Sequence, residues 1–258
     1  MASRKISKRD HWDRFWKGSS RIEEVYANEG RITERLLKLI RPEGMRILEV
    51  GAGSGRDGLL LSRAGGEVVS LDYSLPSLQV IREQLEEDDT LSLCCGDAFA
   101  LPFGDESFDL VFHQGLLEHF RNPDDLIAEN VRVLKPGGYI LVDVPQRYHY
   151  YTLIKHCFIA LGAWFAGWEC EYSVRELEGL LRRHSLMIVT SYGEWFNPPI
   201  WYRILRKGLM PTGIKLPMYP RLFTAIRKVF GGVRTSILRH RWALYSTLVI
   251  GTIARKKG

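Results

Sequence analysis

The stretch RILEVGAGSGRDG (residues 46–58) decides the fold, because a short apolar run leads directly into a turn with three glycines. The run from Arg46 to Val50 is typical of a buried strand. Glycines at 51, 53 and 55 let a ligand approach the backbone, and the N–H groups of a following helix point at that ligand. We therefore predict a strand, a ligand-binding turn and a helix through LLLSRAG (59–65).

The chain alternates between strand and helix patterns on both sides of this stretch. Further strands are predicted at 67–72, 91–95, 108–113, 139–144, 187–192 and 244–254. Helices are predicted at 74–87, with Ser74 as N-cap, at 123–134, and from Ser173, where Ser173 and Glu176 form a capping box. Pro136-Gly137-Gly138 is interpreted as the turn between helix and strand. This rhythm predicts a doubly wound α/β sheet.

Two acidic residues follow the glycine turn at informative positions. Asp72 closes the second predicted strand, 21 residues after Gly51, where a carboxylate suits paired ribose hydroxyls. Asp97 follows the third strand. Residues 53–58 also satisfy the dinucleotide pattern G-x-G-x-x-G, so NAD competes as the ligand. Glu49 counts against NAD, because dinucleotide-binding strands are usually wholly apolar before the turn.

Four motifs in order resemble the class I S-adenosylmethionine-dependent methyltransferases: ILEVGAGSGRDG (47–58), VVSLDYS (68–74), CGDAFALPFGDESFDLVF (95–112) and RVLKPGGYILVDVP (132–145). The resemblance covers residues 46–145 closely and the remainder weakly. It implies a Rossmann-like, seven-stranded, mostly parallel sheet whose last strand, expected at Leu244–Ala254, is antiparallel. It also implies S-adenosyl-L-methionine as the cofactor.

The resemblance assigns cofactor-binding roles to residues at the ends of the first four strands. The glycine turn and Glu49 would hold the methionine portion, Asp72 the ribose, and Asp97 the adenine. The full set that the resemblance implies is Glu49, Gly51, Ala52, Gly53, Gly55, Asp72, Tyr73, Asp97, Ala98, Phe99, His113 and Gln114.

Methyl transfer from a sulfonium is an in-line displacement, so a protein mainly supplies proximity and alignment. A base is needed only when the acceptor must lose a proton. The candidates are His113 and His119, with Glu118 and His149 as further options, and each histidine also fits a structural role. The sequence FHQG (112–115) lacks the Asn/Asp-Pro-Pro-aromatic motif of enzymes that methylate exocyclic amines of DNA bases or glutamine side chains.

The charge of the chain is strongly asymmetric. Residues 195–258 contain 13 Lys and Arg and no Asp or Glu, whereas residues 1–194 carry 23 basic and 30 acidic residues. Within 195–242 the basic residues alternate with aromatic ones such as Trp201, Tyr202, Phe223 and Phe230. This pattern fits an interfacial segment on anionic lipid, and it also fits single-stranded nucleic acid. A solvated basic face without a partner remains open.

The sequence divides into an N-terminal helical cap (1–45) and a methyltransferase domain (46–258) with a helical lid insertion near 147–170 and a basic aromatic insertion near 195–242. The lid would present an apolar pocket for the acceptor, lined by Tyr148, Tyr150, Tyr151, Phe158, Trp164, Phe165 and Trp168. No metal site is expected from the four cysteines. The expected location is cytoplasmic, with peripheral membrane association as an option.

Three functions therefore stay open. The first is methyl transfer to a small-molecule, lipid-like or glycan-linked acceptor. The second is RNA methylation through the basic C-terminal segment, with nucleic acid the less favoured partner. The third is a non-catalytic S-adenosylmethionine-binding partner protein.

Overall fold

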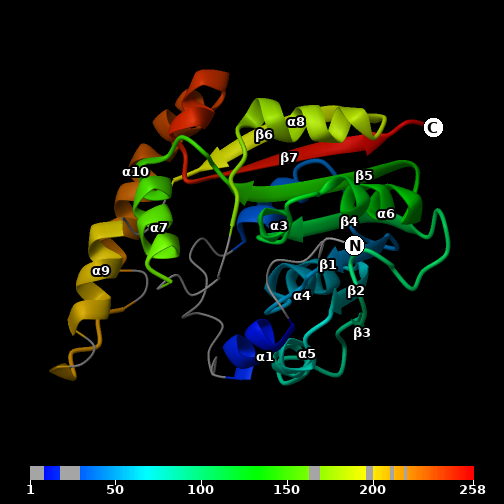
Figure 1. Ribbon diagram of the computed structural model, residues 1–258, viewed down its shortest axis with the longest axis horizontal. Helices are drawn as coiled ribbons and strands as arrows, with labels where there is room; N and C mark the ends of the chain where they lie inside the picture. Colours follow the sequence, from blue (N-terminus) through cyan, green and yellow to red (C-terminus); the bar gives the residue numbers. More distant parts are fainter. Residues whose placement is uncertain (1–8, 18–29, 163–168, 196–199, 210–211, 218–219) are drawn as a thin grey trace.

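A seven-stranded sheet forms the centre of the computed structural model, which describes residues 9–17, 30–162, 169–195, 200–209, 212–217 and 220–258 (Figure 1). The strand order is β3-β2-β1-β4-β5-β7-β6. β7 is antiparallel to both of its neighbours, which confirms the predicted fold class. The strands are β1 (Arg46–Val50), β2 (Glu67–Asp72), β3 (Leu91–Cys95), β4 (Phe108–Gln114), β5 (Leu134–Pro145), β6 (Leu186–Glu194) and β7 (Val249–Lys256).

Helices cover both faces of the sheet, because successive side chains of a strand point to opposite faces. Ile47 belongs to the core under the N-terminal helices, and its neighbour Leu48 belongs to the core on the other face. The helices around the sheet are α1 (Arg9–Lys17), α3 (Arg31–Leu36), α4 (Arg56–Arg63), α5 (Leu75–Arg82), η1 (Leu117–His119), α6 (Asp124–Val133) and α8 (Val174–Arg183). Residues Ile32 and Leu36 of α3 are fully buried in the first of these cores.

Three predicted boundaries were wrong. The helix after Ser74 ends at Arg82, not at residue 87. The last strand begins at Val249, because residues 241–246 form the 3-10 helix η3 (Arg241–Ser246). Pro136-Gly137-Gly138 lies inside β5 rather than before it. The pairing of β5 with β4 shifts register there, so these glycines form a strand irregularity: Gly137 has φ 76°, and a Cβ on Gly138 would lie 3.0 Å from the Asp109 carbonyl oxygen.

Three further helices attach at the edge of the sheet where the parallel strands end: α7 (Tyr150–Ala160), α9 (Ile200–Leu209) and α10 (Arg221–Leu238). α7 follows β5, α9 follows β6, and α10 precedes the antiparallel β7. Figure 1 shows all three on the side toward which the β4 and β5 arrows point. None of the described helices combines the length and apolar character needed to span a bilayer.

Candidate functional site

A cavity opens beyond the carboxyl ends of β1, β2, β3 and β4. This is the edge at which open α/β sheets bind ligands. Most of its wall comes from the turns after these strands, and α1 closes it from outside the sheet. The lining residues are Trp12, Trp16, Gly51, Gly53, Leu71, Asp72, Tyr73, Gly96, Asp97, Ala98, Gln114, Gly115, Leu116, His119 and Phe120.

The glycine turn after β1 forms one wall and depends on glycine for both space and backbone conformation. Gly51 has φ 65°, and a Cβ there would lie only 2.7 Å from Leu116 Cδ1. Gly55 also has φ 65°, and a Cβ there would meet Ile81 at 2.7 Å. Gly51 and Gly53 line the cavity, whereas Ala52 and Gly55 shape the turn without lining it. The turn therefore brings bare backbone to the cavity surface.

Asp72 is fixed at the end of β2 by two backbone donors. The Gly53 N–H donates to its Oδ2 at 2.9 Å, and the Ser74 N–H donates to its Oδ1 at 2.8 Å. Burial raises the pKa of the Asp72 carboxyl, and these backbone hydrogen bonds oppose that effect. Asp72 also lines the cavity, so its carboxylate can accept from ligand hydroxyls there.

The loop after β3 carries the second acidic residue into the cavity. Asp97 Oδ1 accepts from the Phe99 N–H at 3.0 Å, which holds Gly96, Asp97 and Ala98 against the cavity. Phe99 itself does not line the cavity. Its ring packs edge-on against Phe120, with 4.8 Å between the centroids, and so supports a side chain that does.

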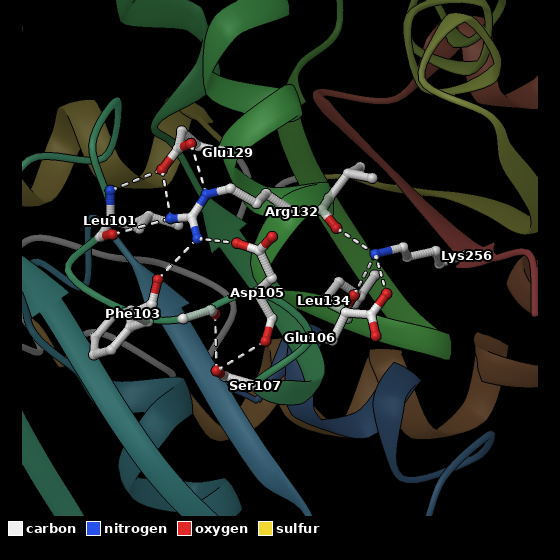
Figure 2. A network of polar contacts seen from close by, with 11 residues as sticks. Leu101, Phe103, Asp105, Glu106, Ser107, Glu129, Arg132, Leu134 and Lys256 are labelled. Atoms are coloured by element: carbon white, nitrogen blue, oxygen red, sulfur yellow. Dashed lines mark hydrogen bonds and ion pairs between the residues drawn. The ribbon is translucent and has the colours of Figure 1, made fainter.

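Arg132 of α6 holds the next part of the same loop (Figure 2). Its guanidinium donates to the carbonyl oxygens of Leu101 at 3.0 Å and Phe103 at 2.8 Å. It also donates to Glu129 and Asp105, while Glu129 accepts from the Leu101 N–H at 2.9 Å. The sequence analysis missed this support. The only signal for it was a Glu–Arg pair three residues apart on a helix.

Glu49 lies beneath the glycine turn instead of in the cavity. Its carboxyl is buried and accepts a hydrogen bond from Ser70 Oγ at 2.7 Å. A Cβ on Gly58 would collide with Glu49 Oε2, so the first turn of α4 packs directly on the carboxyl. Burial raises the pKa of Glu49 to about 8. The position fits a residue that organises the turn.

The two residues that end β4 have different surroundings. His113 is fully buried, and neither ring nitrogen has a hydrogen-bond partner among the described residues. Burial lowers the pKa of His113 to about 3, so the ring is neutral near pH 7. His113 does not line the cavity, but Gln114 does. This arrangement favours a core role for His113 over that of a base.

Gln114 connects the cavity to a buried polar network. With its amide nitrogen toward Asp57 Oδ2 (3.1 Å) and its amide oxygen toward Arg31 Nη2 (2.7 Å), it satisfies both neighbours. Arg31 also donates to Asp143 Oδ1 at 2.6 Å, and Tyr192 donates to Asp143 Oδ2 at 2.9 Å. An arginine of α3 is thereby fixed next to the methionine end predicted for the cavity.

Helix α1 supplies a wall that the sequence analysis did not foresee. Trp12 and Trp16 line the cavity, and the Trp12 ring contacts the edge of His119 with 4.9 Å between the centroids. Ser74 Oγ donates to Asp13 Oδ1 at 2.6 Å and so ties α1 to the start of α5. Ser74 is the predicted N-cap by position, but its hydroxyl makes this contact instead of a capping bond.

Of the four base candidates, His119 alone lines the cavity. Glu118 is buried, and burial together with the nearby Glu169 raises the pKa of its carboxyl. His149 caps α7, with its Nδ1 accepting from the Tyr151 N–H at 3.2 Å. The described residues contain no group of three or more side chains arranged to hold a metal ion.

Comparison with known proteins identifies the domain built around this cavity. Residues 48–142 match the sequence profile of a methyltransferase domain. The chain carries a class I S-adenosylmethionine-dependent methyltransferase domain. This matched range contains the glycine turn, Asp72, Asp97 and Gln114, which are the residues that bring the first four strand ends to the cavity.

Several curated proteins are similar in sequence to the methyltransferase domain. The demethylmenaquinone methyltransferase of Renibacterium salmoninarum is 41% identical over 99 residues, which cover 38% of this chain and 40% of that protein. The malonyl-[acyl-carrier protein] O-methyltransferase of Methylococcus capsulatus is 38% identical over 119 residues, covering 44% and 43%. The chain thus spans less than half the length of either relative.

Solved structures resemble the methyltransferase domain over nearly the whole chain. A chain from the complex of the Haloferax volcanii Trm112 methyltransferase activator with a methyltransferase has a TM-score of 0.65 at 20% identity, with 98% of each chain covered. The [4+2]-cyclase SpnF has a TM-score of 0.58 at 21% identity, covering 94% of this chain and 90% of that one. These similarities show the fold alone, which hosts more than one chemistry.

S-adenosylmethionine is the cofactor of this family, and the cavity of the methyltransferase domain fits it. At Gly51 a Cβ would lie 2.7 Å from Leu116 Cδ1, so the turn and Leu116 pack this closely only with glycine there. Asp72, Asp97 and Ala98 line the cavity at the ends of β2 and β3, where the sequence predicts the ribose and the adenine.

Proposed function

We propose that this chain transfers a methyl group from S-adenosylmethionine to a small, lipid-like acceptor. The observation that supports the proposal is the cavity itself. It joins the glycine turn, Asp72 and Asp97, the three features of a donor site, to an apolar wall of Trp12, Leu116 and Phe120. A donor and an apolar acceptor can thus be held in one enclosed space.

The chain's own residues would act by positioning. When bound, the cofactor supplies a methyl group on a positively charged sulfur with a neutral leaving group. Gly51 and Gly53 would fix the methionine end, Asp72 the ribose, and Gln114 the region next to the amino group. Trp12 and Trp16 exclude water from the cavity. Holding donor and acceptor in line accounts for much of the rate in such displacements.

We propose His119 as the residue that removes a proton where the acceptor has one to lose. It lines the cavity beside Trp12, and a neutral imidazole has a ring nitrogen that can accept a proton. His113, also predicted as a base, would act as a core residue in this proposal, because it lies outside the cavity.

The acceptor class rests on two kinds of support. The relatives are named for demethylmenaquinone and for malonyl-[acyl-carrier protein], both small or carrier-bound molecules. The cavity wall on the acceptor side is aromatic and aliphatic. A glycan-linked acceptor fits this wall less well than a lipid-like one. We also propose a cytoplasmic protein that associates peripherally with the membrane from which the acceptor comes.

Two alternatives make different predictions. An RNA methyltransferase would use the basic residues of 195–242 to bind single strands, which a gel shift with single-stranded RNA at physiological salt detects. A non-catalytic binding protein would keep donor affinity without turnover. The methyltransferase domain profile and the methyltransferase names of the relatives favour the enzyme.

Calorimetry and a transfer assay test the proposal in sequence. S-adenosylhomocysteine should bind the protein, and NAD should not. Radiolabelled S-adenosylmethionine should then label an organic-solvent extract of membranes in a protein-dependent way, with the Asp72→Ala variant as the blank. Binding of NAD but not of S-adenosylhomocysteine would refute the donor assignment. Label that enters RNA but not the lipid extract would refute the acceptor class.

A further inference from the structure

Helix α7 buries polar side chains and exposes apolar ones, which is the reverse of an ordinary surface helix. Its polar residues Thr152 and Lys155 are buried, with only 3% of the Lys155 side chain exposed. Its apolar residues recur at helical spacing on the opposite side and face solvent: Tyr150, Leu153, Ile154, Phe158 and Leu161. Leu153 is 73% exposed and Leu161 is 79% exposed. Surface helices of globular proteins normally place such a stripe against the core.

Specific contacts hold α7 in this orientation. Lys155 Nζ lies 2.7 Å from Glu169 Oε2 and 2.6 Å from Glu171 Oε1, and all three side chains are buried. Thr152 Oγ1 donates to the Gln146 carbonyl oxygen at 2.9 Å. Turning the apolar stripe inward would break this buried cluster and leave charges without partners. The exposure of the stripe is therefore built into the fold.

Two neighbouring helices expose apolar side chains in the same manner. On α10, Val229, Val233 and Ile237 recur every four residues and are exposed, with Phe230 beside them. On α9, Trp201 and Leu205 are exposed one turn apart, and Trp242 is exposed in η3. Exposed apolar groups of this extent mark an interaction surface. The sequence analysis placed the α7 aromatics in the acceptor pocket, yet none of the described ones lines the cavity; Trp164, Phe165 and Trp168 lie outside the described residues.

The positive charge of the segment that contains α9, α10 and η3 indicates which kind of partner this surface binds. Residues 195–246 carry 10 basic residues and no acidic one. Arg234 and Arg241 pair with Glu194 and Glu178, whereas Lys215 and Arg239 are exposed. Exposed apolar side chains combined with an excess of positive charge are typical of segments that lie in the interface of an anionic bilayer. A second copy of this chain that used the same face would bring two basic regions together, which disfavours a symmetric contact.

We propose that α7, α9, α10 and η3 form a docking face for an anionic lipid bilayer, on the edge of the sheet that also holds the donor cavity. α7, α9 and α10 lie at the edge of the sheet where β4 and β5 end (Figure 1). The cavity opens at the same edge. The docking face deepens the proposed function, since it would bring the donor site to an acceptor dissolved in the membrane. Its test needs no methyl transfer.

Vesicle sedimentation provides that test. Wild-type protein should bind vesicles of phosphatidylglycerol and phosphatidylcholine at least ten-fold more tightly than pure phosphatidylcholine vesicles, and rising salt should weaken the binding. Leu153→Ser/Leu161→Ser should lower binding at least ten-fold. Leu37→Ser/Leu39→Ser, which alters exposed leucines leading to the amino end of β1, should leave it unchanged. Lys215→Glu/Arg239→Glu should reduce the preference for anionic lipid.

Affinity for S-adenosylhomocysteine should be unchanged in every variant, which shows that each one is folded. Absence of wild-type binding to either vesicle at low salt would overturn the docking face. So would equal binding by Leu153→Ser/Leu161→Ser, or tighter binding to single-stranded RNA than to the anionic vesicles. A wild-type protein that binds vesicles but not S-adenosylhomocysteine would support the docking face and refute the proposed function, so the two failures are distinguishable.

Discussion

The Gly53 amide donates a hydrogen bond of 2.9 Å to Asp72 Oδ2, which joins the glycine turn to the acid at the end of the neighbouring strand. The parallel pairing of β1 with β2 places their carboxyl ends side by side and makes this contact possible. The donor site is thus a single unit, in which the residue expected at the ribose also fixes the turn expected at the methionine. Mutations at Gly53 or at Asp72 should therefore affect both the shape of the turn and the binding expected at the ribose.

Asp72→Ala should weaken S-adenosylhomocysteine binding by about five- to 150-fold, or about 1–3 kcal/mol, because buried hydrogen bonds to a charged group are lost. Isothermal titration calorimetry measures the change. Asp88→Ala is the matched control, since this exposed residue lies between α5 and β3 and does not line the cavity. Equal affinities for Asp72→Ala and wild type would contradict the ribose assignment.

Gly51→Ala should abolish measurable donor binding. The added Cβ would lie 2.7 Å from Leu116 Cδ1, at a backbone φ of 65° that alanine adopts reluctantly. Gly179→Ala in α8 is the control, because no atom lies within 4 Å of its Cβ position. That control should raise the free energy of unfolding by up to about 1 kcal/mol through helix propensity. Retained affinity in Gly51→Ala would show that the ligand does not approach this turn.

Glu49→Gln should alter how stability depends on pH. The folded pKa of Glu49 is raised to about 8 from the usual 4.5, so the folded protein holds a proton that the unfolded chain has released. Its stabilising contribution is therefore complete below about pH 4.5 and is lost as the pH rises toward 8. Between these values the free energy of unfolding should fall by up to about 1.4 kcal/mol per pH unit.

Urea unfolding of the ligand-free protein at pH 5, 6.5 and 8 measures this dependence. The glutamine variant should show a smaller decrease over the same range, because glutamine cannot release a proton. Parallel pH profiles for wild type and variant would mean that Glu49 is ionised in the folded state.

His113→Ala and His119→Ala should separate a core role from a catalytic one. His113→Ala should cost about 2–4 kcal/mol of stability, since it empties a fully buried site, while donor affinity changes little. His119→Ala should lower turnover by about 100-fold if the acceptor loses a proton, with some loss of stability because His119 is also buried. Thermal unfolding and single-turnover kinetics measure the two effects. Full turnover in His119→Ala would exclude it as a base.

Arg132→Ala should loosen the loop that presents Asp97 and Ala98. The change leaves the carbonyl oxygens of Leu101 and Phe103 without this donor and removes the Arg132 bonds to Glu129, at a cost of about 1–3 kcal/mol. Donor affinity should fall even though Arg132 lies outside the cavity. Lys135→Ala, which removes an ion pair with Asp109 on the same side of the sheet, should leave the affinity unchanged.

The sequence by itself determined the strands of the donor half of the sheet. β1, β2 and β3 begin and end at the predicted residues, because their signals are local: apolar runs bounded by glycine and aspartate. The same local chemistry fixed the capping box at Ser173, where the Glu176 N–H donates to Ser173 Oγ at 3.3 Å and the Ser173 N–H to Glu176 Oε2 at 2.8 Å.

Only the tertiary structure decided which side chains face the cavity. His113 and Gln114 are adjacent in the sequence, but a strand turns neighbouring side chains to opposite faces, and the pairing of β4 with β1 and β5 set which one is buried. Trp12 reaches the cavity through a contact 61 residues apart in sequence, Ser74 to Asp13. The apolar stripe of α7 is exposed because Lys155, on the opposite side of the helix, pairs with two buried carboxylates. Such long-range contacts leave no local pattern in the sequence, so only the tertiary structure reveals them.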